Sequence, residues 1–355
     1  LKDRSAILPA GRNADGAFWL NSGNFVSSSW YFPALPDWAL EFNAQNRADA
    51  FAGVDWMGTT MPDSPGRELY AALDATPFAD QLVLEFALEV LSQETLGKGP
   101  KTDLLSVSFS AMDYLGHASG PDTQSMKAMV LSLDEKIGQL LSAAEKQAGR
   151  GNVLLVMTAD HGVAPVPEEN ISKQLPGGRI DTQTERDAVQ AALAAVFGEG
   201  EYILSGSDMS YYLDYHQAGA AQSERSAIEE VAAEALRRMP HVARVYTRSM
   251  LEAGLVNGDR IDQRVLNGFN RAESGDVIVI HDPSWIAGGR GTTHGSPYSY
   301  DTHVPLLFWG PRTLVKPGQY SKEAGIHDIA PTLATMLGIS IPSGAMGRVL
   351  DEILP

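Results

Sequence analysis

The stretch NVLLVMTADHG, residues 152–162, is an apolar run with the length of a buried β-strand. It ends at Asp160 and His161, an acid and a histidine side by side, and not at turn residues alone. Two interpretations explain this ending about equally well. One is a solvated loop with an incidental histidine, and the other is a metal site at the carboxyl end of a sheet.

The residues before this stretch predict the fold. LLSVSF, residues 104–109, has the pattern of a short strand, and residues 122–147 carry apolar side chains at helical spacing. Strand, helix and strand within about 55 residues form a βαβ unit. We therefore expect an α/β fold with a mostly parallel central sheet and helices on both of its faces. Ligands bind outside the carboxyl ends of the strands in such sheets.

The sequence pattern changes between residues 166 and 285. Two alanine-rich amphipathic segments, 184–197 and 222–239, alternate there with short strand-like runs. This pattern predicts an inserted α+β subdomain at 166–285. The α/β core is then formed by residues 1–165 and 286–355, and it resumes at HVPLLFWG.

Composition narrows the partners and the chemistry. The 355 residues carry a formal net charge of −17, which disfavours binding to polymeric nucleic acid or to an anionic membrane. There are no cysteines, so thiolate ligands and disulfides are excluded. No apolar stretch approaches the roughly 20 residues needed to span a bilayer. The chain opens with LKDRSAILPAG and no methionine, so we expect a fragment that lacks its amino-terminal part.

A second acid–histidine pair follows the first predicted strand. In SAMDYLGHASGP, Asp113 and His117 are four positions apart, which places both side chains on one face of a helical turn. Such a pair alone is a weak signal. It follows a strand that neighbours the one ending at Asp160 and His161, so the two pairs strengthen each other as ligands of one site.

Two further histidines lie in GGRGTTHGSPYSYDTHVPLLFWG, residues 288–310. His294 occupies a loop rich in glycine and threonine. Such a loop suits a side chain that points into a binding site better than one that packs in the core. His303 directly precedes an apolar strand, and a structural role bonding to backbone fits it better than metal binding. We therefore treat His303 as a candidate to hydrogen-bond to a metal ligand without binding the metal itself.

The types of ligand predict the metal. Imidazoles mixed with carboxylates, and no sulfur, suit Zn²⁺ better than Ca²⁺. A catalytic zinc commonly takes about three protein ligands and keeps one position open. Five ligands are too many for one such ion and one too few for two. We therefore expect two zinc ions and a sixth ligand, a carboxylate, outside these residues.

DYLGH, TADHG and THGSPYSYDTHVPLLFWG together resemble the alkaline phosphatase superfamily. The resemblance is closest to its phosphate-irrepressible, periplasmic alkaline phosphatases, and the nucleotide pyrophosphatase/phosphodiesterases share the same motif set. The resemblance implies that Asp113, His117 and His294 hold one zinc ion and that Asp160 and His161 hold the other. It also implies a Thr or Ser nucleophile and an Asp ligand upstream of this chain.

The same resemblance gives the opening segment a role. It implies that Lys2 and Arg4 contact non-bridging oxygens of the substrate's phosphoryl group. Such fixed cations favour a dianionic phosphate monoester over a diester. Thr158, Ser108 and Ser110 match no motif of the family, so we do not propose any of them as the nucleophile.

We therefore expect a phosphate monoester hydrolase that acts on small molecules in the periplasm through a phospho-enzyme. A phosphodiesterase or nucleotide pyrophosphatase of the same superfamily uses the same metal ligands and is the main alternative. A non-catalytic metal-binding protein is another. A sulfatase is disfavoured because the chain has neither a cysteine nor a Ser-x-Pro-x-Arg sequence.

Overall fold

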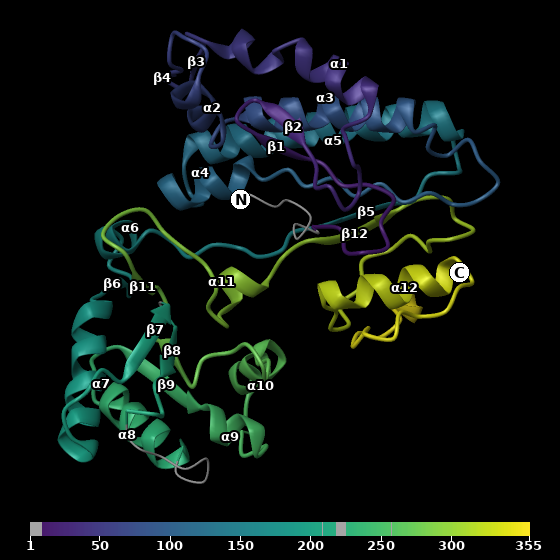
Figure 1. Ribbon diagram of the computed structural model, residues 1–355. Coiled ribbons are helices and arrows are strands. Elements are labelled where there is room, and N and C mark those ends of the chain that lie inside the picture. The colour runs from purple at the N-terminus through teal and green to yellow at the C-terminus, as the bar shows by residue number, and fades with distance from the viewer. Residues whose placement is uncertain (1–8, 208, 218–224, 257) are drawn as a thin grey trace. The chain divides into compact units, whose positions relative to one another are not determined.

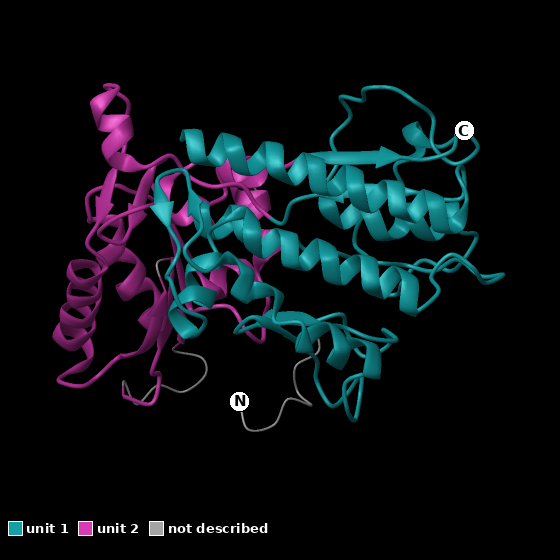
Figure 2. Cartoon of the chain, turned by 90° about the horizontal axis from the view of Figure 1, so that it is seen from above, with its two compact units in different colours: residues 1–115, 123–160, 305–355 teal, residues 116–122, 161–304 magenta. Residues whose placement is uncertain are grey.

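The computed structural model describes residues 9–207, 209–217, 225–256 and 258–355. Lys2 and Arg4 therefore lie outside the described residues. Figure 2 shows two compact units: one contains Leu1–Leu115, Thr123–Asp160 and Pro305–Pro355, and the other contains Gly116–Asp122 and His161–Val304. The domain boundaries predicted after residues 165 and 285 differ from these and stay a prediction.

The first unit is built from helices and short strands. Its helices are α1 (Asp37–Ala44), α2 (Arg67–Leu73), α3 (Pro77–Gln93), α5 (Gln124–Ala148) and α12 (Ile329–Met336). Its strands are β1 (Trp19–Asn21) with β2 (Asn24–Val26), β3 (Asp55–Trp56) with β4 (Thr59–Thr60), and β5 (Leu155–Thr158) with β12 (Leu306–Trp309). The helix predicted at 122–147 is confirmed as α5.

Side-chain caps explain where the two long helices begin. The Thr76 hydroxyl accepts a hydrogen bond from Phe78 N at the start of α3, and Pro77 occupies the first turn. Thr123 plays the same part for α5 by accepting from Met126 N. The backbone of α5 then ends at Gly149, whose φ of 94° an L-residue with a side chain rarely adopts.

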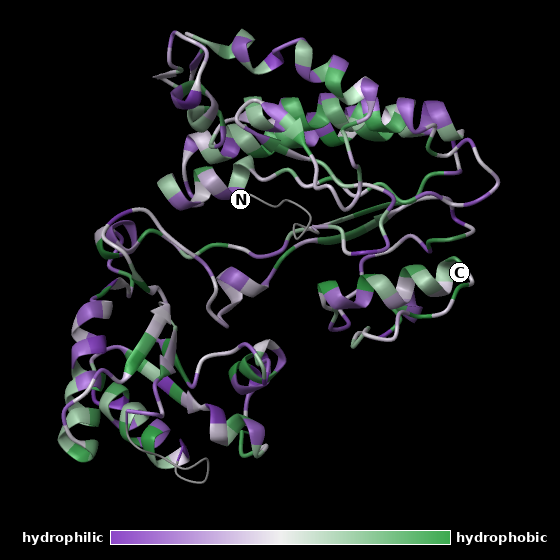
Figure 3. Cartoon of the chain, viewed as in Figure 1, coloured by the Kyte–Doolittle hydropathy of each residue, from purple (hydrophilic) through white to green (hydrophobic). Residues whose placement is uncertain are grey.

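The strand that leads into the TADHG motif does form, but its partner is not the predicted one. β5 pairs with β12 in the antiparallel sense, with Leu306 opposite Thr158. Figure 1 shows α3 and α5 on one side of this pair and α12 on the other, and Figure 3 shows the two strands as apolar. The α/β class therefore holds, and this pair is antiparallel.

The strand predicted at 104–109 is not formed within the described residues. This segment has neither helical nor strand structure, and Leu104 is 84% exposed. A strand exists only where its backbone N–H and C=O groups meet those of a neighbour. The apolar pattern of the segment carries no information about that neighbour, so the parallel ladder with 153–158 could not be established from sequence.

An aromatic core stabilises the first unit. The Phe25 and Phe86 rings stack with centroids 3.9 Å apart, and Phe42 meets Phe86 edge-on at 5.1 Å. A second buried cluster joins Met126 and Met129 to residues of the helix that carries DYLGH. Each fully buried side chain of this size contributes about 1.5–3 kcal/mol, so the packing fixes that helix against α5.

The second unit contains a four-stranded antiparallel sheet with two helices packed on it. The strands run in the order β7 (Ile203–Ser207), β8 (Ser210–Leu213), β10 (Val277–His281) and β9 (Val242–Thr247). The helices packed on the sheet are α7 (Thr182–Phe197) and α8 (Arg225–Arg237), which confirms the two predicted alanine-rich helices. The remaining elements are α6 (Pro167–Ser172), β6 (Gly178–Ile180), α9 (Arg248–Glu252), α10 (Arg260–Gly268), β11 (Trp285–Ala287) and α11 (Ser299–Thr302).

β6 and β11 form a parallel pair, with Trp285 opposite Gly178. Among the helices of the described residues, none is long and apolar enough to cross a membrane.

A buried carboxylate lies at the start of α4 (Ala111–Ser119), the helix that carries DYLGH. Asp80 on α3 is 1% exposed, and its Oδ1 accepts a hydrogen bond of 3.3 Å from Ala111 N. Burial raises the pKa of Asp80 to about 6, although the Ala111 bond and the charge of buried Lys136 oppose the shift. Asp80 therefore gives the first backbone N–H of α4 a partner inside the core.

The Asp80 carboxyl predicts a pH dependence of stability. Its pKa in the folded state is raised above that in the unfolded chain, so the folded state holds a proton that the unfolded chain releases between about pH 4 and 6. Stability therefore falls as the pH rises through this window. Asp80→Asn removes this effect, so between pH 4 and 7 the unfolding free energy of the variant should rise relative to wild type by on the order of 2 kcal/mol. Urea unfolding at several pH values measures it, and parallel profiles would contradict it.

Candidate metal centre

The helix α4 positions two of the predicted ligands. It begins where Asp113 N and Tyr114 N donate to Ser110 O, at 3.2 and 3.4 Å. The boundary between the two units falls inside this helix, after Leu115, so the helix itself fixes Asp113 relative to His117. Both side chains are half-buried and project from the same face, as the four-residue spacing predicts.

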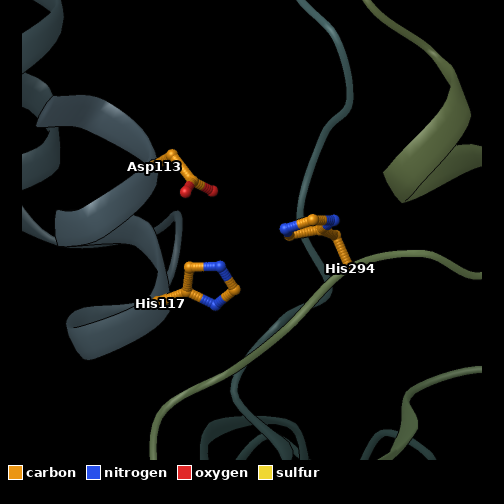
Figure 4. A group of neighbouring side chains, drawn as sticks. All are labelled: Asp113, His117 and His294. Atoms are coloured by element: carbon orange, nitrogen blue, oxygen red, sulfur yellow. The ribbon is translucent and has the colours of Figure 1, made fainter. Parts of the chain in front are cut away.

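His294 completes a group of three side chains. Figure 4 shows Asp113 and His117 pointing from α4 toward His294. Each of the three offers one ligand atom, and these atoms all lie within 4.8 Å of one another. Zinc binds nitrogen and oxygen at about 2.0–2.2 Å, so a tetrahedral ion separates its ligand atoms by roughly 3–4 Å. Two imidazoles and a carboxylate within 4.8 Å of one another could therefore hold one metal ion after small side-chain adjustments.

Hydrogen bonds tie the His294 loop to α4. Thr292 N donates to His117 O, and His117 Nδ1 lies 2.9 Å from Thr292 O. Because a carbonyl oxygen only accepts, the ring proton of His117 is on Nδ1 and the Nε2 lone pair is left for a metal. The Thr292 hydroxyl donates to Ala164 O at 2.7 Å. The loop thus also holds the segment that follows His161.

Two glycines permit these close approaches. A Cβ on Gly291 would lie 2.2 Å from His117 O, and its φ of +64° is in the left-handed region. A Cβ on Gly162 would lie 2.1 Å from Tyr300 O. Any larger residue at either position would push apart the segments that carry the histidines.

The second predicted pair of ligands lies beside this group. The His161 ring stacks on His294, with centroids 3.3 Å apart and planes 12° from parallel. His161 Nδ1 lies 2.8 Å from Gly162 O, so its proton is also on Nδ1. Asp160 is exposed in the turn after β5. Within the described residues, the group of three contains neither Asp160 nor His161, and their role as ligands stays a prediction.

His303 has a different setting. It follows α11, it is exposed, and its backbone N–H donates to Ser299 O at 2.9 Å. Its predicted role in supporting a metal ligand stays a prediction.

Asp301 is a neighbour of the site that sequence reasoning missed. It is 4% exposed, and its Oδ2 accepts from Ser296 N at 2.8 Å and from Ser296 Oγ at 2.6 Å. Burial raises the pKa of Asp301, while the Ser296 bonds and the nearby His294 and His161 act against the shift. Its position among aromatic residues in SPYSYD, seven residues after His294, was the signal available in the sequence.

Comparisons with known proteins give consistent matches. The family model described as type I phosphodiesterase/nucleotide pyrophosphatase matches residues 4–304. A Myroides odoratus protein named calcium-transporting ATPase is 32% identical over 100% of this chain and 71% of its own length. Alkaline phosphatase PhoV of Synechococcus elongatus is 31% identical over 100% of the chain and 69% of its own length.

The crystal structure of alkaline phosphatase PafA is also similar, with a TM-score of 0.86 and 28% identity over 100% of this chain and 74% of its own. This likeness confirms the predicted α/β fold class. In a solved variant of PafA, the substituted residues include a threonine, an asparagine, and a lysine and an arginine two positions apart.

Gly291→Ala tests the close contact between the His294 loop and α4. The new methyl group collides with the His117 carbonyl and also strains the backbone, so we expect the unfolding free energy to fall by about 1–3 kcal/mol and zinc binding to weaken. Gly288→Ala is the matched control, because Gly288 has a φ of +91° but no atom within 4 Å of its Cβ position. Equal losses of zinc affinity in the two variants would show that the contact between Gly291 and the His117 carbonyl does not contribute to zinc binding.

Proposed function

We propose that this chain, which belongs to the type I phosphodiesterase/nucleotide pyrophosphatase family, hydrolyses phosphate monoesters with two zinc ions held largely by its own side chains. The enzyme class follows from the relatives. The chain matches alkaline phosphatases along its whole length, at 31% identity to PhoV and with a TM-score of 0.86 to PafA. It is a hydrolase of the alkaline phosphatase kind.

The observation that carries the metal-dependent mechanism is the convergence of Asp113, His117 and His294, whose ligand atoms lie within 4.8 Å of one another. We assign the first zinc ion to these three residues. We assign the second to Asp160 and His161, because the His161 ring lies 3.3 Å from His294. Two rings this close supply donor atoms to ions about 3.5–4 Å apart, the usual spacing of a two-metal site.

The chain's own groups prepare the site for an anionic substrate. His117 and His161 each donate Nδ1–H to a carbonyl oxygen and direct Nε2 outward. Asp113 and Asp160 contribute one negative charge each, which only partly neutralises two divalent ions. When bound, such ions supply positive charge that stabilises the attacking and departing oxygens of an in-line displacement at phosphorus. Local positive charge is needed because the chain as a whole carries −17.

The five ligands complete one zinc site and two-thirds of another. We propose that the sixth ligand, a carboxylate, and the Thr or Ser nucleophile lie in a segment beyond these 355 residues. An exposed apolar surface in the first unit supports this. Leu307 and Trp309 on β12 are 52% and 46% exposed, and Leu104 of the same unit is 84% exposed. A segment that covered Leu307 and Trp309 would lie on β12, the partner of the strand that ends just before Asp160.

Lys2 and Arg4 are proposed to bind the non-bridging phosphoryl oxygens. They are two positions apart, like the lysine and arginine substituted in the PafA variant. A monoester dianion carries a charge that a diester lacks, and two fixed cations stabilise it. By the same likeness to alkaline phosphatases, we propose small-molecule monoesters as substrates and the periplasm as the location.

His117→Ala tests the metal assignment in the protein with its whole reading frame. Loss of this imidazole should reduce bound zinc below the two ions per chain expected for wild type, and should lower hydrolysis of an aryl phosphate monoester by at least about a hundredfold. Metal analysis and steady-state kinetics measure the two effects. His216→Ala is the control, because this histidine is exposed and belongs to none of the proposed ligands. Full activity in His117→Ala would remove it from the site.

The Lys2→Ala, Arg4→Ala double variant tests substrate class. We expect kcat/KM for an aryl phosphate monoester to fall by about a hundredfold or more, as the loss of two charge-assisted hydrogen bonds of about 1.5–3 kcal/mol each requires, with a much smaller change for the matching diester. Equal losses on both substrates would remove the proposed role. A wild-type preference for the diester would favour the phosphodiesterase alternative. Zinc binding by the whole protein without hydrolysis of either substrate would indicate a non-catalytic metal-binding protein.

A further inference from the structure

We propose that Asp301 is a positioning residue of the metal centre: with the metal bound, a ring N–H of His294 would donate to the buried Oδ1 of Asp301, and the other ring nitrogen would point at the metal. The inference rests on the proposed function, because it concerns a ligand of the first zinc ion. His117 and His161 are each oriented by a carbonyl oxygen, at 2.9 and 2.8 Å respectively.

The carboxylate of Asp301 is only half satisfied inside the protein. Oδ2 accepts two hydrogen bonds from Ser296, from the backbone N–H and from the hydroxyl. Oδ1 is buried and has no hydrogen-bond partner within the described residues. A buried acceptor without a donor costs about 1–3 kcal/mol, so a donor that reaches it stabilises the arrangement. The nearby His294 acts electrostatically on this carboxylate more strongly than His161 does.

Asp301 also connects the two segments that carry these histidines. Its carboxylate bonds to Ser296, two positions after His294, and its backbone oxygen accepts from Gly162 N at 2.7 Å, one position after His161. Gly162 is in turn in close contact with Tyr300, because a Cβ there would lie 2.1 Å from Tyr300 O. A shift of Asp301 would therefore move both stacked imidazoles.

A carboxylate differs from a carbonyl as a partner for a metal-bound imidazole. Its full negative charge makes the ring a stronger donor to the metal and fixes the tautomer. His294 lies in a loop with glycines at 291 and 295, whereas His117 is fixed by a helix. His294, which is not held by a helix, would thus have a stronger orienting partner than His117.

A purely structural role for Asp301 makes a different prediction. If the carboxylate only fixed the turn at Ser296, the oxygen that faces Ser296 would be sufficient. The variant Asp301→Asn separates the two roles. Its amide oxygen can still accept from Ser296, while its NH₂ group replaces the buried Oδ1 and presents a donor to the histidine in place of an acceptor.

The experiment measures the zinc dissociation constant of the metal-free protein by competition with a chromophoric chelator. We expect Asp301→Asn to weaken zinc binding about 10–100-fold, as loss of a carboxylate behind a metal-bound histidine does. The unfolding midpoint of the metal-free variant should stay equal to wild type or rise. Ser296→Ala removes one bond to Oδ2 and should change zinc affinity by less than Asp301→Asn. Asp328→Asn is the matched control, since Asp328 is also buried and accepts from the backbone N–H groups of Gly325 and Arg348.

Unchanged zinc affinity in Asp301→Asn, with zinc bound by wild type, would overturn the inference and leave the proposed function standing. Failure of wild type to bind zinc would instead overturn the proposed function. If Asp301→Asn does not fold, zinc-loaded wild type supplies a second test by NMR. A ring N–H of His294 protected from exchange with water is expected, assigned by its loss in His294→Gln, and its absence would overturn the inference.

Discussion

The reciprocal hydrogen bonds between His117 and Thr292 join segments 175 positions apart in the sequence. One bond runs from Thr292 N to the His117 carbonyl, and the other from the His117 ring to the Thr292 carbonyl. The first sets the distance between α4 and the His294 loop, and the second sets the tautomer of a metal ligand. Position and chemical form of the imidazole are therefore determined by one residue. A glycine at 291 is required because the chain must pass within van der Waals distance of the His117 carbonyl.

Charge explains why such a site needs so much support. A chain with a net charge of −17 repels a phosphate dianion, and two of its carboxylates, Asp113 and Asp160, would lie at the proposed site itself. The proposed ions reverse the local sign only if the ligands keep them in place at working concentrations. Hydrogen bonds from His117 and His161 to carbonyl oxygens, and the proposed one from His294 to Asp301, would raise metal affinity without adding ligands.

More of the candidate site than of the surrounding fold could be predicted from the sequence. Ligand types and the spacing of Asp113 and His117 are local properties, and a helix necessarily puts positions four apart on one face. Pairing of strands is not local. The run at 104–109 is as apolar as β5, yet only β5 meets a partner in the described residues, and that partner, β12, lies almost 150 positions further along the chain. Asp301 was missed for the same reason. Its role depends on the folded chain bringing Ser296, Gly162 and His294 close to its carboxylate and backbone.

The three histidines differ in how firmly the surrounding structure holds them. His117 is fixed by a helix packed on the buried methionines of α5, and His161 follows the end of a strand. His294 lies in a loop, and its ring centroid lies 5.0 Å from that of His117 and 3.3 Å from that of His161. Because its ring stacks on that of His161, which is assigned to the second ion, a rotation of the His294 ring would disturb a ligand of each proposed ion. A buried carboxylate that holds this ring from behind would limit that rotation where the backbone cannot, so the orientation of His294 would depend on a side chain and not on secondary structure.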